Sequence, residues 1–226
     1  GALLLAGAII VTKIIHEIKT DDPVRYFGTL FLVCAPVAYF TCNPFVGFLA
    51  VAALMSLLGF SVWLFPLCYC IGFKDEEAVG RGTTAAFFVL AAFVYMKITG
   101  VTNPGIKVFE EGALFLGSFV GYLGLLIASS KWYDRGNHSR YFWMQFVTMV
   151  AGVLAIFVGS TFGIGELTNI GVTFFVLWNL EKIGEIMPTD RKAFAYVGLF
   201  VGALIFAFGW FVKTHAALVG PFLLFM

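Results

Sequence analysis

The feature that most constrains the fold is the stretch from Tyr26 to Phe73, which contains no Asp, Glu, Lys or Arg. A soluble fold could not enclose so long an apolar stretch, because part of its surface must face water. Of all 226 residues, 61% are hydrophobic and only 12% are charged. An average soluble domain has roughly 25% charged residues. Because a lipid bilayer accepts this composition, the sequence predicts an all-α, polytopic bundle of membrane helices in a single transmembrane domain.

Apolar segments of membrane-crossing length recur along the chain. A helix crosses the hydrocarbon with about 20 residues, within a range of about 17–25. Asn43 and Pro44 divide the charge-free stretch, because proline cannot continue a helix. Pro66 offers a further break. We predict about eight helices (seven to nine), at 1–15, 26–41, 45–73, 83–99, 112–130, 141–162, 167–183 and 193–212.

The two ends of the chain carry shorter apolar pieces. The opening segment lacks a basic region and a convincing small-residue cleavage site, so we expect a short or truncated membrane helix there and not an intact signal peptide. The last segment, 216–226, is too short to cross a bilayer and is expected to be re-entrant or a partial helix.

The Lys and Arg residues are distributed unevenly between the predicted loops. Eleven of the 14 fall in alternate loops, and the other three are Lys97, Lys107 and Lys213. Cytoplasmic loops of membrane proteins are the ones rich in Lys and Arg. We therefore predict that four loops are cytoplasmic, namely 13–25, 74–82, 131–140 and 182–192.

The loop 131–140 holds the densest group of reactive side chains. Asp134, Arg135 and His138 are its candidate functional residues, and of these only His138 titrates near neutral pH. The aromatic residues at both ends of the loop suit the lipid headgroup layer, and Asp134 to Asn137 suit a turn. We interpret the loop as a bend between two spans, with head-group binding or catalysis as the alternative.

Small residues recur four apart on two predicted helices. In lipid, helices associate through close backbone approach, which small residues permit. Gly117 and Gly121 on one helix, and Gly198 and Gly202 on another, are therefore predicted to be helix-packing positions.

Few polar side chains lie within the predicted spans, and every predicted span is free of charge through its middle. Ion-coupled transporters usually carry charged groups there. Glu166 lies in a predicted outer bend without a basic residue, so it is a site candidate, or alternatively a solvated carboxylate near a helix N-terminus. The candidate binding residues are Gln145, Glu166, Thr168, Asn169 and Asn179.

Metal and cofactor chemistry is not indicated by the sequence. A metal or haem site needs several ligands on one side of a cavity, and no His lies at mid-membrane depth. The four cysteines, at 34, 42, 68 and 70, are expected to be buried free thiols. Ser160 has no His at its depth, so serine hydrolysis is not supported. The Asn-Pro pairs at 43–44 and 103–104 are expected to be capped turns.

The sequence favours a non-enzymatic membrane protein that binds or transports a small neutral or amphipathic solute or lipid. A neutral pathway would be lined by Gly, Ser, Thr, Asn and aromatic residues, which this chain has. The first alternative is a structural or assembly subunit, in contact with other membrane subunits or with copies of itself. The second is an intramembrane enzyme that acts at the cytoplasmic face. Membrane lipid is the expected partner, no cofactor is expected, and a net charge of +1 gives no case for nucleic acid.

Overall fold

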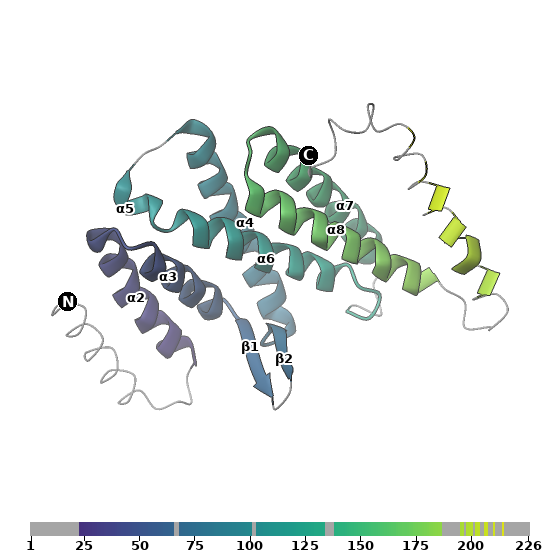
Figure 1. Ribbon diagram of the computed structural model, residues 1–226. Coiled ribbons are helices and arrows are strands. Elements are labelled where there is room, and N and C mark those ends of the chain that lie inside the picture. The colour runs from purple at the N-terminus through teal and green to yellow at the C-terminus, as the bar shows by residue number, and fades with distance from the viewer. Residues whose placement is uncertain are drawn as a thin grey trace. The chain divides into compact units, whose positions relative to one another are not determined.

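The computed structural model describes residues 23–65, 68–100, 103–133 and 138–186, together with scattered positions between 195 and 214. This part of the chain forms seven α-helices and one two-stranded β-hairpin (Figure 1). The chain divides into two compact units, Gly1–Phe175 and Val176–Met226, with the boundary inside the last helix. The elements are α2 Pro23–Thr41, α3 Pro44–Leu57, β1 Phe60–Phe65, β2 Cys68–Phe73, α4 Glu76–Thr99, α5 Pro104–Lys107, α6 Glu110–Ala128, α7 His138–Thr161 and α8 Gly165–Ile186.

The turn between α2 and α3 falls at Asn43 and Pro44, as the proline argument predicts. Cys42 adopts a left-handed conformation with φ 49°. The side-chain oxygen of Asn43 then accepts hydrogen bonds from the backbone nitrogens of Phe45 and Val46, at 3.0 and 3.4 Å. Asn103 caps α5 in the same way, with a 3.0 Å bond from the nitrogen of Gly105. Both Asn-Pro pairs are therefore helix caps, which satisfy backbone donors that have no partner within the helix.

The prediction of one helix over 45–73 is wrong, because α3 ends at Leu57 and a hairpin follows. Gly59 makes the change of direction with φ 103°, a conformation that favours glycine. Antiparallel strands β1 and β2 pair from Phe60 with Phe73 through to Phe65 with Cys68. Strand β1 reads FSVWLF, and aromatic and β-branched residues favour strands over helices. Pro66 lies outside the described residues.

Three helices in the described residues are long and apolar enough to cross a membrane, which are fewer than the predicted eight. They are Glu76–Thr99, Pro104–Ala128 and Ser139–Thr161, and two shorter apolar helices cover Tyr26–Thr41 and Pro44–Leu57. The described residues do not support a count of eight, for two physical reasons, while the predicted spans 1–15 and 193–212 lie largely outside the described residues. The segment 45–73 divides into a short helix and a hairpin, and α8 carries charged residues in both its first turn and its last turns.

Several predicted segments differ from the observed elements in extent. Helix α4 begins at Glu76, within the predicted loop 74–82, because Asp75 accepts a 2.6 Å bond from the nitrogen of Ala78 and caps the helix. The acidic residues of its first turn suit the positive end of the helix dipole. The predicted segments 1–15 and 216–226 lie outside the described residues, as does 193–212 apart from single positions.

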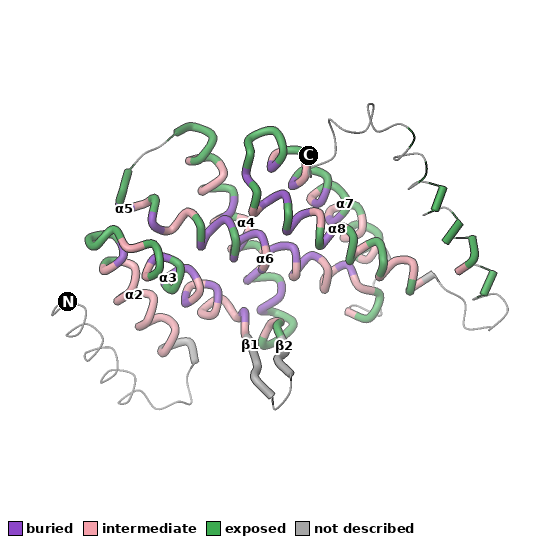
Figure 2. Tube along the Cα trace, in the orientation of Figure 1, coloured by how far each residue is buried: buried purple, intermediate pink, exposed green. Residues whose placement is uncertain are grey.

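Helix α6 is the central element of the first unit (Figure 2). It supplies residues to two buried apolar clusters. One joins it to α3, β1 and α4 and includes Met55, Phe60, Ala86 and Val120. The other joins it to α4, α7 and the first half of α8 and includes Leu114, Tyr122, Ile164 and Phe174. Each neighbouring helix is therefore positioned by its contact with α6.

Candidate functional site: a groove between two helices

Glycines on α6 hold α4 close to it. A Cβ built on Gly117 would lie 3.3 Å from the backbone oxygen of Ala86, which is a tight contact between backbones. A Cβ on Gly121 would lie 3.2 Å from the ring of Phe87, and one on Gly124 would overlap Thr83. Small residues permit such an approach, and in lipid this close packing drives helix association. Gly117 and Gly121 therefore lie at the α4–α6 interface.

Helix α7 packs against α6 and α8 through a different set of residues. The hydroxyl of Tyr122 on α6 donates a 2.9 Å hydrogen bond to the backbone oxygen of Ala151 on α7. Gly152 faces Phe175 on α8, with an added Cβ 2.5 Å from its ring, and Gly159 faces Thr168. Gly152 and Gly159 of α7 therefore face α8.

A groove lies between α4 and α7, over the C-terminal part of α6. Its volume is about 620 Å³, and its walls are almost entirely apolar. Typical small-molecule sites have volumes of about 300–1,000 Å³. Helix α4 lines it from Val79 to Ala91, a length of about 18 Å at 1.5 Å per residue. Leu125 forms part of the floor, and Met144 and Val147 on α7 form the opposite wall.

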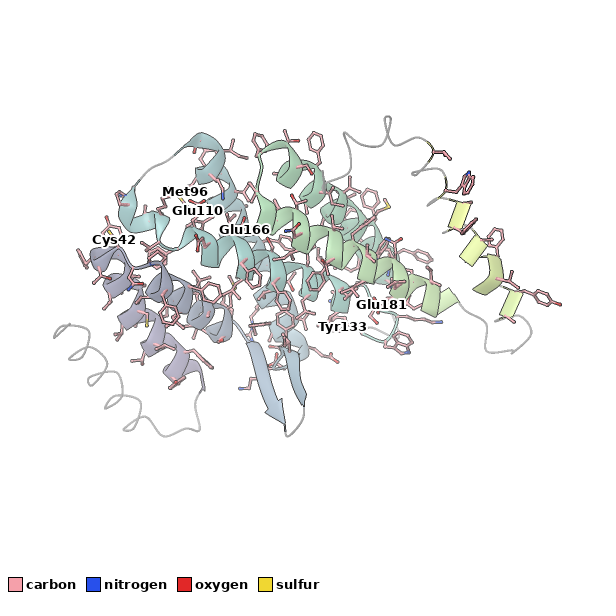
Figure 3. All side chains as sticks on the ribbon, viewed as in Figure 1. Cys42, Met96, Glu110, Tyr133, Glu166 and Glu181 are labelled. Atoms are coloured by element: carbon pink, nitrogen blue, oxygen red, sulfur yellow. The ribbon has the colours of Figure 1, made fainter. Side chains whose placement is uncertain are left out.

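One end of the groove carries polar side chains, one of which is cationic. Tyr133, which follows α6, and Arg140, in the first turns of α7, line this end. The hydroxyl of Tyr133 donates a 2.8 Å bond to the backbone oxygen of Glu76, and Tyr133 is labelled in Figure 3. The guanidinium carbon of Arg140 lies 5.8 Å from the centre of the Tyr133 ring, within range of a cation–π contact. The groove therefore combines an apolar body with a cationic end.

The structure describes only part of the predicted loop 131–140. Asp134 and Arg135 lie outside the described residues, and His138 is the first residue of α7, with its side chain also outside them. Among the described side chains of this region, those of Tyr133 and Arg140 reach the groove. The available sequence signal was the spacing of Arg140, Met144, Val147 and Ala151, which places four residues on one face of a helix.

The five predicted binding residues do not form one site. Gln145, near the start of α7, donates a hydrogen bond to the backbone oxygen of Ser129 at the end of α6. Thr168 is buried against Gly159, at the other end of α7, and its hydroxyl lies 3.1 Å from the oxygen of Ile164. Asn169 is exposed on α8, and Asn179 belongs to the second unit.

Glu166 lies in the first turn of α8, where a carboxylate is stabilised by the helix dipole. Figure 3 labels Glu166 and Glu181, which lie toward opposite ends of this helix. In the second unit, the amine of Lys182 lies 2.8 Å from Glu185 and 4.0 Å from Glu181. The close Lys182–Glu185 pair offsets part of the cost of burying these two charges.

Gly198 and Gly202, the other predicted packing positions, belong to the second unit. Cβ atoms built on Gly198 and Gly202 would meet no described atom within 4 Å. Cys34 and Cys42 are free thiols, and the prediction that both are buried is wrong, because Cys42 is exposed in the α2–α3 turn. The described residues contain no group of three or more His, Cys, Asp or Glu side chains that could hold a metal ion.

The polar residues of the first unit tie the α4–α6 pair together at both ends of α4. At its C-terminal end, the amine of Lys97 lies 2.9 Å from a carboxylate oxygen of Glu110 on α6, which Figure 3 labels beside Met96. At its N-terminal end is the bond from Tyr133 to Glu76. The groove combines volume, apolar walls and a charged group. Comparisons with protein-family models, curated proteins and solved structures find no match for this chain.

Proposed function

We propose that this is a membrane protein that binds a lipid in the groove between α4 and α7, with an acyl chain along the apolar walls and the head group beside Tyr133 and Arg140. The observation that carries the proposal is the combination of an apolar groove of about 620 Å³ with a cationic end. Both α4 and α7 are candidate membrane spans, so a lipid in the surrounding bilayer has direct access to the groove.

The polar end of the groove decides which lipid is bound. An acyl chain gains little by moving from bilayer hydrocarbon into an apolar groove, because both surroundings are equally apolar. Selectivity therefore comes from the head group. A guanidinium has five N–H donors and can hold a phosphate or carboxylate beside its other partners. An anionic amphiphile fits this end better than a neutral one.

The proposed side of entry is the cytoplasmic leaflet. The loops 74–82 and 131–140, both rich in Lys and Arg, were predicted to share the cytoplasmic side. The bond from the hydroxyl of Tyr133 to the backbone oxygen of Glu76 joins these two segments and supports that sidedness. The cytoplasmic leaflet is also the one that contains the anionic lipids PS and PI.

Binding is proposed in preference to catalysis because of the side chains that line the groove. The polar ones among the described lining residues are Thr83, Thr84, Tyr133 and Arg140. Nucleophilic catalysis needs a nucleophile with an adjacent base, and these four side chains offer no such base. They suit recognition of a head group, by hydrogen bonds and by charge.

The test uses photoreactive lipids in nanodiscs that contain the full chain. Val147→Trp fills the groove, whereas Val150→Trp adds the same bulk to an exposed position on α7. We expect labelling by a photoreactive anionic phospholipid to fall at least tenfold, a change of about 1.4 kcal/mol, in Val147→Trp and to stay unchanged in Val150→Trp. Equal labelling of both variants would reject the groove as the binding site.

A second arm of the test measures the head-group contribution. Arg140→Gln should abolish the preference for the anionic lipid over a neutral diacylglycerol probe, while Arg140→Lys should retain part of it, because it keeps the charge but not the planar fork of donors. Retention of the full preference in Arg140→Gln would reject the role of Arg140. The comparison of Val147→Trp with Val150→Trp would then still test whether the lipid binds in the groove.

A further inference from the structure

Thr84 on α4 lines the groove, and its hydroxyl is not bonded to the rest of the described protein. Threonine hydroxyls inside helices commonly donate to the backbone oxygen four residues earlier. Those of Thr83 and Thr148 do so, to Val79 at 2.5 Å and to Met144 at 2.8 Å. Thr84 makes no such bond among the described residues, and it is exposed. Its O–H group is therefore available to a ligand in the groove.

Thr84 lies where the charged start of α4 gives way to its apolar part. Arg81, three residues earlier, has a side chain that is 66% exposed and lies 4.0 Å from Asp75. The stretch 82–96 that follows contains no charged residue and belongs to a candidate membrane span. A hydroxyl moved into hydrocarbon without a hydrogen-bond partner costs free energy. An acceptor atom on a bound lipid would remove that cost at Thr84.

The depth of Thr84 in the groove follows from the direction of α4. The bond from Tyr133 to Glu76 places the cationic end of the groove beside the start of this helix. Gly80 is among the first residues of α4 that line the groove, and Thr84 is four residues further along. At 1.5 Å per residue, Thr84 is about 6 Å deeper than Gly80. Beyond it, the α4 wall is formed by apolar residues only, from Phe87 onward.

A phospholipid offers one kind of acceptor at this depth. Its phosphorus and the carbonyl carbon of the acyl ester on the central glycerol carbon are joined by five bonds. Three consecutive chain bonds span up to about 3.6 Å, so five span about 6 Å. With the phosphate beside Arg140, the ester carbonyl therefore reaches the depth of Thr84. The acyl chain beyond the ester has no polar atom, and a lipid with an ether linkage has no carbonyl at all.

We propose that the hydroxyl of Thr84 donates a hydrogen bond to the ester carbonyl of the lipid, so that the groove selects an ester-linked anionic phospholipid over its ether-linked counterpart. This inference rests on the proposed binding of a lipid in the groove and names the class of that lipid more closely. Arg140 recognises the anionic head group, Thr84 recognises the linkage, and the apolar walls hold the acyl chain without regard to its chemistry.

The experiment measures competition for the groove in nanodiscs that contain the full chain and a photoreactive anionic phospholipid. The competitors are a diester and a diether phosphatidylserine with identical chain lengths. For the unaltered protein, we expect the diester to displace the probe at about fivefold lower concentration, the effect of one hydrogen bond. Thr84→Val removes the hydroxyl and keeps nearly the same shape, so the two competitors should become equal. Thr84→Ser keeps a hydroxyl and should retain the preference.

Thr161→Val is the matched control, because Thr161 is an exposed threonine at the end of α7 that does not line the groove. It should retain the preference, and all variants should keep the melting temperature of the unaltered chain. Equal competition by the two lipids in the unaltered protein, or a preference that persists in Thr84→Val, would overturn the role of Thr84. If Val147→Trp still abolishes labelling in that case, lipid binding in the groove stands; labelling that Val147→Trp does not change would reject both proposals.

Discussion

The two faces of α4 show how the same helix can be closed on one side and open on the other. Toward α6, its backbone meets a row of glycines, with the oxygen of Ala86 only 3.3 Å from a Cβ built on Gly117. Toward α7, its side chains line a groove of about 620 Å³. The difference comes from the partners, because α6 offers glycines to α4 whereas α7 offers Arg140, Met144 and Val147.

This contrast indicates that α7 does not approach α4 as closely as α6 does, so a groove remains between α4 and α7. The glycines of α7 at 152 and 159 face α8, whereas Met144 and Val147 line the groove toward α4. In lipid, the backbone distance between two helices follows the size of the residues between them. The groove is therefore a consequence of where small residues lie, and substitutions at the closed α4–α6 interface and in the open groove should have opposite effects.

The largest effect is expected on the closed face. Gly117→Leu would push α6 away from the backbone of α4, and overpacking of this kind typically costs about 1–3 kcal/mol. Reversible unfolding in mixed micelles measures the loss of stability. Gly184→Leu, at a position on α8 where an added Cβ meets no described atom within 4 Å, is the control and should change little. Equal losses in both variants would contradict the close approach at Gly117.

The opposite sign is expected on the open face. A Cβ on Gly80 meets no described atom within 4 Å, although Gly80 lines the groove. Gly80→Leu removes a glycine from a helix, so the free energy of unfolding should stay unchanged or rise by up to about 1 kcal/mol. The same variant should reduce photolabelling by the lipid probe, since its side chain enters the groove. A marked loss of stability would show that the groove face is packed after all.

A smaller effect is expected where α6 holds α7. Tyr122→Phe removes the hydrogen bond from Tyr122 to the oxygen of Ala151, beside the groove. Bonds of this kind between membrane helices contribute about 0.6 kcal/mol on average. Unfolding of the variant in micelles measures the loss. A loss above about 3 kcal/mol would indicate that this hydroxyl does more than join the two helices, since exceptional values need a further mechanism.

The smallest effect is expected at the end of the closed face. Lys97 and Glu110 form a half-exposed ion pair between α4 and α6. A double-mutant cycle of Lys97→Gln and Glu110→Gln should give a coupling of about 0.5 kcal/mol, because solvent screens such pairs. The coupling should shrink in high salt. A coupling insensitive to salt would mean that the pair is more enclosed than its exposure indicates.

Local chemistry made part of the fold predictable. Asn43 followed by Pro44 predicts a helix cap and a turn, and both are present, because proline and asparagine act on their immediate neighbours. The charge-free stretch did not reveal the hairpin. Short apolar runs fit a buried helix or a strand equally well, and the choice depends on which surfaces they meet.

The candidate site was less predictable than the elements that carry it. The polar residues within apolar segments predicted a binding site that includes Gln145, Glu166 and Thr168. In the structure these residues make helix-end or packing contacts. The aromatic residues at the ends of the loop 131–140 were expected in the headgroup layer, but the groove that Tyr133 and Arg140 face exists only between two helices that are far apart in the sequence. A cavity has no local signature, since each wall by itself resembles an ordinary apolar helix face.

The sequence by itself determined an α-helical chain with segments apolar and long enough for lipid, because the hydrophobic effect and backbone hydrogen bonding act on every residue regardless of its distant neighbours. The tertiary structure alone decided which apolar segments became long helices and which became a hairpin, and which helix faces closed. Those outcomes depend on how side chains from distant segments fit against one another, and that fit is not encoded at any single position.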